Sequence, residues 1–401
     1  MRRVGHIIGR RGWREGGGAL VLALCVLGMA ACRTVSKTDG HHLYSTPKYG
    51  SDRFVVVRGY TIHYVEAGEG SPLLLIPGAF TTYRTWNRVL PGLMLHNRVL
   101  AVDYLGVGDS DKPEQGFGYT VEEQADVMAE LIAALGLGRV NVMGASYGGA
   151  VALNLAARYP DLVERVVCIE GGALITPEML NYSRLGALVE WPVLGDIIWG
   201  FMQSGLFDGA TARSIMGPAW DGLSPAERQE IVGVFSANIH TVSRSSWAGI
   251  YRVITHRIDF MDALDRTRVP MLYLYGEDSK YRAVAEMNAR HFERHNPSIE
   301  VIAFRGGIHD LQLQYPGEVS RIVERFLGTT PADGVAARSA AAAGGAGTPA
   351  PGTRLYEQMQ IENRVLETDW SLYDTDHDEL RHAADDPGSP LIRTAVVSAT
   401  D

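Results

Sequence analysis

The stretch NVMGASYGGAVALNLAARYP, residues 141–160, joins an apolar run to a helical pattern through a serine held between glycines. Its central pentapeptide, GASYG at 144–148, fits the pattern G-x-S-x-G. When a strand precedes such a turn and a helix follows it, the serine is exposed at the strand end, and bulkier residues in place of the glycines would collide with both elements. The pentapeptide alone is a weak signal, but this context makes it strong. We therefore predict that Ser146 is a nucleophile rather than only a small residue in a tight turn.

Short apolar runs that end in glycine recur on both sides of this turn. They read FVVVRG, TIHYVEAG, PLLLIPG, RVLAVDYLG, RVNVMG, RVVCIEGG, PMLYLYG and IEVIAFRGG. The first two are typical of an antiparallel pair, and the others of strands buried in a parallel sheet. Helical patterns separate them, for example Val121–Leu135, which Thr120 and Glu123 begin with a capping box. The alternation predicts an α/β fold with a mostly parallel, eight-stranded sheet flanked by helices.

The alternation is carried by two segments, 53–172 and 269–328, which form the predicted core. Between them, residues 173–268 are rich in large apolar side chains, helical in pattern and interrupted by Pro192 and Pro218. This insert follows a strand end, which is where active sites of open parallel sheets lie, so we expect it to form a helical cap over the site. Most of its apolar side chains should pack the cap onto the core, and a minority should line the pocket beneath it.

The first 32 residues have the pattern of an export signal. Arginines precede a short apolar run, Ala19–Cys32, and the small residues Ala30 and Ala31 stand before Cys32, as in a bacterial lipoprotein signal, although Met29 is unusual there. Lipidation of Cys32 would hold the protein on a membrane surface in the cell envelope, with residues 33–52 as a tether. A periplasmic location is equally compatible with this prediction of a cell-envelope protein. A secreted protein or an uncleaved helical anchor is the alternative.

The other end of the chain changes composition past the core. Residues 329–353 consist almost wholly of Ala, Gly, Pro, Ser and Thr, which predicts a flexible, disordered linker. Residues 354–401 are acidic, and their first part spaces apolar residues from Leu355 to Trp370 in a loosely helical way. A solvated tail is the favoured interpretation, and a short helix that docks on an unidentified protein partner is the alternative.

The composition excludes several classes of function. The formal net charge of −9 is spread along the chain, and no basic cluster is interleaved with aromatic residues, so nucleic acid is not an expected partner. Cys168 is the one cysteine outside the N-terminal segment, which argues against a disulfide framework. No C-x-x-C or H-E-x-x-H pattern occurs, so we expect neither a metal nor a cofactor.

A serine nucleophile needs a base to take its proton, and the base needs a carboxylate to orient it. Of the twelve histidines, His309 in GGIHD stands out because it alone follows a late strand, and we predict that it is the base. Asp278, in YGEDS, is the favoured acid because it follows a strand and precedes the histidine in the chain order Ser, Asp, His. Glu170, in VVCIEGG, is the alternative acid because it ends the strand next to that of Ser146.

Acyl transfer places negative charge on the substrate oxygen, which backbone N–H groups must stabilise. Tyr147 follows the nucleophile and is the first expected donor of this oxyanion hole. The second should come from the loop after LLLIPG, with Ala79 favoured and Phe80 as the next choice. Polar residues of the turn DYLGVGDSDKP, residues 103–113, are expected to be structural.

Together these motifs resemble the α/β-hydrolase superfamily over residues 53–328. The resemblance rests on GASYG, DYLGVGDSDKP, YGEDS and GGIHD, although the oxyanion loop carries Pro77 where members usually have histidine. It implies that Ser146, Asp278 and His309 are the nucleophile, the acid and the base of a serine member, similar to esterases and lipases, with a helical cap. Dehalogenase and epoxide-hydrolase branches share this layout but use an aspartate nucleophile, so the serine argues against both.

The resemblance therefore implies an enzyme that cleaves carboxylic esters of small to medium acyl or aromatic substrates through an acyl-serine intermediate. Two alternatives stay open at this point. One is a carbon–carbon bond or thioester hydrolase of the same fold, and the other is an envelope lipoprotein that uses the fold as a binding module. Expected partners are a small acyl substrate and a membrane surface reached through the lipid anchor.

Overall fold

The computed structural model describes residues 47–177, 184–296, 298–329 and 391–396. The predicted signal segment with Cys32, the linker from residue 330 and most of the tail lie outside the described residues. Within the described ranges, no helix is both long and apolar enough to cross a membrane.

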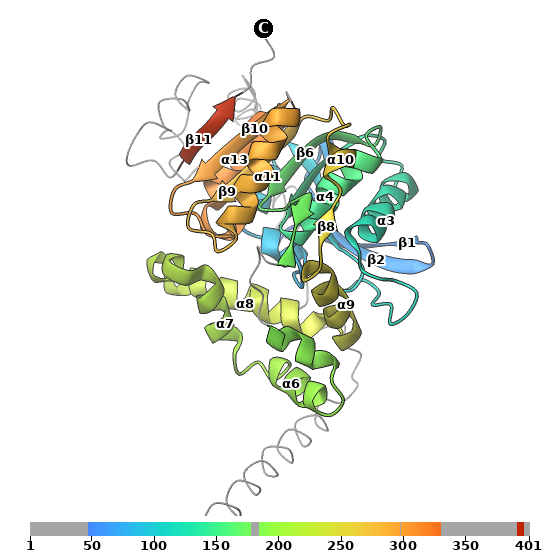
Figure 1. The fold of residues 1–401 in the computed structure, drawn as a ribbon, viewed down its shortest axis with the longest axis vertical. Coiled ribbons are helices and arrows are strands. Elements are labelled where there is room, and N and C mark those ends of the chain that lie inside the picture. Colours follow the sequence, from blue (N-terminus) through green and yellow to red (C-terminus); the bar gives the residue numbers. More distant parts are fainter. Residues whose placement is uncertain (1–46, 178–183, 297, 330–390, 397–401) are drawn as a thin grey trace, which may run out of the picture.

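A mostly parallel sheet forms the centre of the molecule, with the strand order β1-β2-β4-β3-β5-β6-β9-β10-β11 (Figure 1). The strands are β1 (Ser51–Val57), β2 (Tyr60–Ala67), β3 (Ser71–Ile76), β4 (Asn97–Asp103), β5 (Val140–Ala145), β6 (Val163–Ile169), β9 (Met271–Gly276), β10 (Ile299–Phe304) and β11 (Leu391–Val396). Strands β3 to β6, β9 and β10 run parallel, and β2 is antiparallel to both β1 and β4. The eight predicted strands and the predicted fold class are confirmed.

The ninth strand, β11, comes from the acidic C-terminal segment. It pairs antiparallel with β10, from Leu391 opposite Phe304 to Val396 opposite Glu300. The prediction of a solvated tail or a short helix is therefore wrong for residues 391–396. The edge of a sheet presents backbone N–H and C=O groups to which a further strand can bond. The segment LIRTAV, rich in aliphatic and β-branched residues, supplies that strand beside β10.

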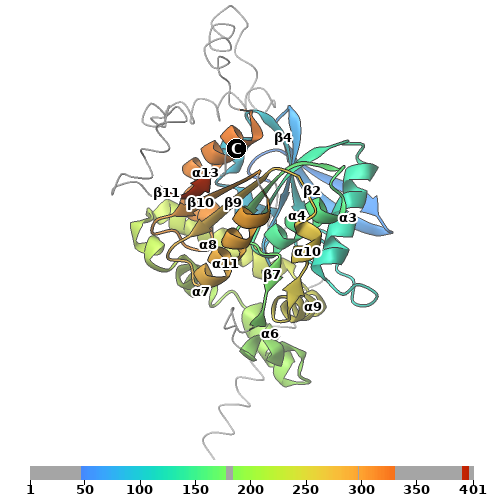
Figure 2. The same ribbon diagram turned by 45° about the horizontal axis from the view of Figure 1, so that its top comes forward.

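Helices cover both faces of the sheet (Figure 2). The apolar cores on the two faces are built by α3 (Val121–Ala134), α4 (Tyr147–Arg158), α10 (Met261–Leu264) and α11 (Arg282–His295) on one face, and by α2 (Leu90–Leu93), α12 (Leu311–Gln314) and α13 (Pro316–Leu327) on the other. The capping box predicted at the start of α3 is confirmed, because the Thr120 and Glu123 side chains each bond to the other residue's backbone N–H.

The inserted segment forms a layer of helices beyond one end of the sheet (Figure 1). It contains β7 (Leu174–Ile175), η2 (Arg184–Glu190), α6 (Leu194–Met202), α7 (Asp208–Met216), η3 (Gly217–Gly222), α8 (Pro225–Thr241), α9 (Arg244–Ile254) and β8 (Ile258–Asp259). Strands β7 and β8 pair antiparallel at its base. Buried residues of α7 and α8 pack against Ile308 and Leu313, on either side of His309. The cap thus closes over the loop that carries the predicted base.

Candidate active site

Ser146 lies in a sharp turn between β5 and α4. Its backbone has φ 53° and ψ −119°, a conformation that is strained for a residue with a side chain. A Cβ atom added to Gly144 would lie 2.1 Å from the carbonyl oxygen of Gly148, and one added to Gly148 would lie 2.2 Å from the carbonyl oxygen of Ile76. Both positions therefore require glycine, which is the steric reason for the G-x-S-x-G pattern.

His309 follows β10, and its ring is joined to Glu170 at the end of β6. The His309 Nδ1 atom lies 2.6 Å from Glu170 Oε2. The Glu170 side chain is fully buried, whereas the His309 side chain keeps 18% of its exposure. The carboxylate also accepts hydrogen bonds from the Gly276 N–H (2.7 Å) and the Ser279 hydroxyl (2.6 Å). Three donors thus fix the buried carboxylate, and the carboxylate fixes the imidazole.

The choice of Asp278 as the acid is corrected by this arrangement. Asp278 is exposed, and its backbone N–H donates to the Gly307 carbonyl at 2.9 Å. Among the described residues, the carboxylate that contacts His309 is Glu170, the alternative from the sequence. The loop after β9 still contributes to the pair, because its Ser279 hydroxyl supports Glu170.

The electrostatics of the pair follow from burial and charge. Burial disfavours the imidazolium and lowers the pKa of His309, but the hydrogen bond and negative charge of Glu170 outweigh burial, so that the pKa is raised above its usual value. The ring of Tyr281 packs edge-on against the imidazole, with 4.7 Å between the centroids. The carboxylate thereby fixes Nδ1 and leaves Nε2 as the ring nitrogen for proton transfer.

Ser146 and the pair lie at the same edge of the sheet. The Ser146 N–H donates to the carbonyl oxygen of Ile169 at 2.7 Å, and Ile169 directly precedes Glu170. Within the described residues, no hydrogen bond joins the Ser146 hydroxyl to His309. The backbone therefore brings Ser146, the predicted nucleophile, close to Glu170.

The loop after β3 faces Ser146. Its Gly78 would place an added Cβ 3.5 Å from the Ser146 Cβ. The Phe80 N–H donates to the Tyr104 hydroxyl at 3.0 Å, so this alternative oxyanion donor is already occupied. The Ala79 N–H makes no hydrogen bond among the described residues, and Tyr147 opens α4, where backbone N–H groups lack helical partners. The two favoured donors thus remain available.

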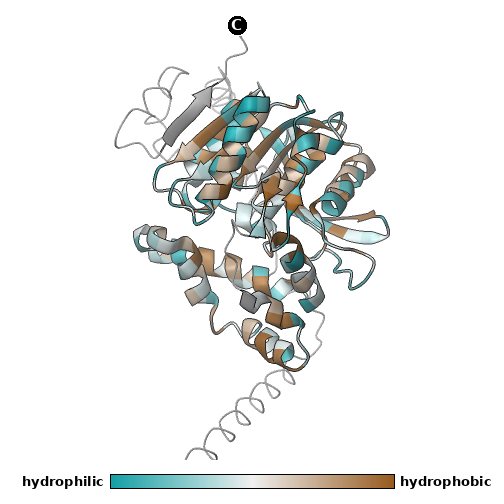
Figure 3. Cartoon of the chain, in the orientation of Figure 1, coloured by the Kyte–Doolittle hydropathy of each residue, from teal (hydrophilic) through white to brown (hydrophobic). Residues whose placement is uncertain are grey.

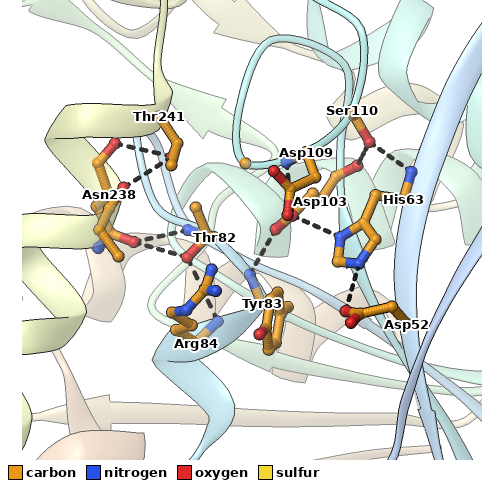
Figure 4. Close-up of polar contacts among 12 residues, drawn as sticks. Asp52, His63, Thr82, Tyr83, Arg84, Asp103, Asp109, Ser110, Asn238 and Thr241 are labelled. Carbon is orange, nitrogen blue, oxygen red and sulfur yellow. Dashed lines mark hydrogen bonds and ion pairs between the residues drawn. The ribbon is translucent and has the colours of Figure 1, made fainter. Parts of the chain in front are cut away.

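Two sets of polar contacts hold that loop in place (Figure 4). The Asp103 carboxylate accepts from the Tyr83 N–H at 2.8 Å and lies 2.8 Å from the buried His63 ring. On the other side, Asn238 of the cap helix α8 accepts from both the N–H and the hydroxyl of Thr82, each at 2.9 Å. The structural role predicted for Asp103 fits these contacts. The link to Asn238 has no sequence signal, because it joins residues 156 positions apart.

Aromatic side chains from the cap cover the same loop. The rings of Phe80 and Trp247 stack with 3.9 Å between centroids, and Trp199 of α6 meets Trp247 edge-on at 6.2 Å. The Trp247 indole N–H is buried without a hydrogen-bond partner among the described residues. Phe80 also has φ 61°, so that three of the six non-glycine residues with positive φ in the described ranges, Phe80, Ser146 and Glu170, belong to this site. Strain concentrated at one place is typical of functional sites.

Two groups of side chains in the described residues bring ligand atoms close enough to hold a metal ion. They are Asp265 with His291 and His295, and His63 with Asp103 and Asp109. In the second group, Asp103 contacts the His63 ring and accepts a hydrogen bond from the Asp109 backbone N–H. In the first, His291 and His295 lie on α11 and Asp265 follows α10. Neither group includes a candidate catalytic residue.

Comparison with known proteins supports the fold described above. A family profile described as the alpha/beta hydrolase fold matches residues 71–190. An uncharacterized protein of Mycobacterium tuberculosis is 28% identical over 286 residues, which cover 69% of this chain and 81% of the relative. The 2-hydroxy-6-oxo-2,4-heptadienoate hydrolase of Pseudomonas putida is 36% identical over 155 residues, covering 38% of this chain and 51% of that enzyme.

Among solved structures, an esterase from a Rhodococcus species superposes with a TM-score of 0.57 at 23% identity. The match covers 70% of this chain and all of the esterase. At this level of identity the likeness concerns the fold.

Proposed function

The chain belongs to the α/β-hydrolase superfamily, and from that premise we propose that it is a serine hydrolase that cleaves carboxylic esters. The observation that carries the proposal is the buried Glu170–His309 pair at the strand ends beside a strained serine turn. A carboxylate that fixes Nδ1 of a histidine, close to a serine in a strained turn between glycines, is the arrangement that catalyses acyl transfer in serine hydrolases.

In the proposed mechanism, His309 Nε2 takes the proton of the Ser146 hydroxyl as its oxygen bonds to the acyl carbon. The N–H groups of Tyr147 and Ala79 stabilise the negative oxygen of the tetrahedral intermediate. His309 then gives its proton to the leaving alcohol, and the acyl-serine forms. Water attacks this ester with His309 again as the base, which releases the acid and restores the serine.

The aromatic group formed by Phe80, Trp199 and Trp247 supports a substrate with an apolar acyl or aromatic part. The second candidate function is cleavage of a carbon–carbon bond in a dienone, which the partial likeness to the Pseudomonas putida hydrolase favours. Ser146 argues against a dehalogenase or an epoxide hydrolase, because those branches use an aspartate.

A panel of substrates separates the candidates. We expect turnover of p-nitrophenyl esters of short and medium acyl chains, together with labelling of Ser146 by a fluorophosphonate, located by peptide mapping. Cleavage of a dienone or of acyl thioesters without any ester turnover would replace the ester proposal by the second candidate or by a thioesterase. A folded protein that neither turns over any substrate nor reacts with the fluorophosphonate would be a binding module.

The pH dependence of turnover should report the Glu170–His309 pair. The reaction needs neutral His309, and the pKa of this residue is raised above 6.5 by Glu170. We therefore expect kcat/KM to be low in acid and to rise with pH, with a midpoint above 6.5. A pH–rate profile measured with one ester checks this, and removal of the Glu170 charge should move the midpoint to lower pH. A midpoint at or below 6.5 in the unmodified enzyme would contradict the proposed electrostatics.

We place the enzyme in the cell envelope, held by a lipid on Cys32. The support is the sequence pattern of basic residues, short apolar run and Ala30-Ala31-Cys32. Metabolic labelling with palmitate tests this, and labelling that persists after Cys32→Ala would contradict it.

A further inference from the structure

Exposed apolar side chains are concentrated at one place on the described surface. Of the nine large apolar side chains that are exposed, two, Phe54 and Val56, lie on β1. The other seven, called here the apolar tip, are Trp191, Val193, Leu194, Ile197, Phe201, Leu206 and Phe207. Leu194, Ile197 and Phe201 lie in the helix α6, and the other four lie just before or after it. The helix is mostly hydrophobic in Figure 3. Apolar surface gathered in this way marks an interaction site more often than a chance exposure.

One apolar face of the helix α6 packs against the rest of the cap, and a second apolar face is exposed. Leu194, Ile197 and Phe201 are spaced i, i+3 and i+7, so they share one side of the helix, and all three are exposed. Gly195 is buried, and Trp199 packs on Trp247. The face with Gly195 and Trp199 thus attaches the helix to the cap. No described residue buries the face with Leu194, Ile197 and Phe201.

The apolar tip lies where a membrane anchor could present it. In both views, α6 lies at the end of the cap farthest from the sheet (Figures 1 and 2). The described chain begins at Pro47, and the next residue, Lys48, forms an ion pair of 2.6 Å with Glu230 of the cap helix α8. The chain thus enters the molecule beside the cap. Fourteen residues, 33–46, separate Cys32 from this point, and fully extended they span about 46–50 Å.

The charges around the tip favour an apolar contact rather than an electrostatic one. Glu190 is paired with Arg252 at 2.6 Å, Asp196 is paired with Arg244, and Asp208 lies 3.3 Å from His240. Glu190 and Asp196 are therefore each compensated by an arginine, and the formal net charge of the whole chain is −9. Among the described residues, Arg244 and Arg252 beside the tip are already paired with acids. The tryptophan, phenylalanine and aliphatic side chains of the tip suit the boundary between lipid head groups and acyl chains.

From these observations we infer that the apolar tip inserts into the surface of a phospholipid bilayer, so that the cap faces the membrane. The inference concerns a surface, and it holds or fails separately from the ester chemistry at Ser146. It also does not need the lipid on Cys32, which would only raise the local concentration of the tip at the membrane.

Hydrogen exchange of the full chain, with and without vesicles of phosphatidylethanolamine and phosphatidylglycerol, tests the inference. We expect backbone amides of residues 191–207 to exchange about tenfold more slowly on vesicles, because insertion removes them from water. The protection should be the same at low and high salt, since the contact is apolar. The double variant Leu206→Glu/Phe207→Glu should lose it. The matched control Val56→Glu, which changes an exposed apolar residue on β1, should keep it.

Three results would overturn the inference. The first is unchanged exchange of residues 191–207 on vesicles to which the protein is bound. The second is protection that is present without vesicles and rises with protein concentration, which would assign the tip to a second copy of the chain. The third is protection without vesicles that is independent of concentration, which would assign it to another segment of the same chain. A melting temperature equal to that of the unmodified protein shows that the double variant is folded.

Discussion

The Ser146→Ala enzyme should lose ester turnover almost completely, with kcat/KM lowered by about ten-thousand-fold or more. Without the hydroxyl, no acyl-enzyme can form, and only the oxyanion donors and substrate binding remain to assist water. Stability should stay close to that of the parent, because alanine and serine carry the same strain at φ 53°. Initial rates with p-nitrophenyl butyrate and a thermal melt measure both quantities.

A matched control for this experiment is Ser298→Ala, which changes an exposed serine outside the site. It should leave turnover and fluorophosphonate labelling unchanged. If the Ser146→Ala enzyme kept its turnover, or if the fluorophosphonate labelled another serine, the nucleophile would have to be sought elsewhere.

The second large effect distinguishes the two acids. We expect Glu170→Gln to lower kcat/KM by about a thousand- to ten-thousand-fold, and Asp278→Asn to lower it by less than about threefold. The amide of a glutamine can keep its oxygen toward the Gly276 N–H, which leaves its NH2 group facing His309 Nδ1. The imidazole proton must then move to Nε2, the nitrogen that has to accept the serine proton. Asp278 is exposed and touches no catalytic group, so its charge has little influence.

Ser279→Ala serves as the control for structural damage at Glu170, because it removes one donor to the carboxylate and keeps the charge. We expect a loss that is small beside that of Glu170→Gln, with both variants folded by thermal melt. A larger loss for Asp278→Asn than for Glu170→Gln would return the role of the acid to Asp278.

The sheet and the serine turn could be predicted because their signals are local. Continuous apolar runs closed by glycine mark buried strands, and the steric demands of Gly144 and Gly148 lie within a few residues of Ser146. His309 could be predicted from the sequence in the same way, since it is the one histidine that follows a late strand. These features depend on neighbours in the chain, so a single sequence carries them.

The acid could not be settled in the same way. Glu170 and Asp278 both follow strands, and both lie between Ser146 and His309 in the sequence, so chain order does not separate them. One signal did favour Glu170. It ends a continuously apolar run, where a carboxylate is buried and must be compensated by donors, whereas Asp278 stands among polar neighbours. The strand β11 was missed for a different reason, because its partner β10 lies about ninety residues earlier, before the linker.

The two hydrogen bonds between Thr82 and Asn238 join the cap helix α8 to the loop that carries Ala79. Any displacement of α8 that separates these two residues must break both bonds. Under the proposed function, the loop that supplies the Ala79 N–H would then lose one of its supports. The position of the cap and the geometry of the oxyanion hole are therefore mechanically coupled.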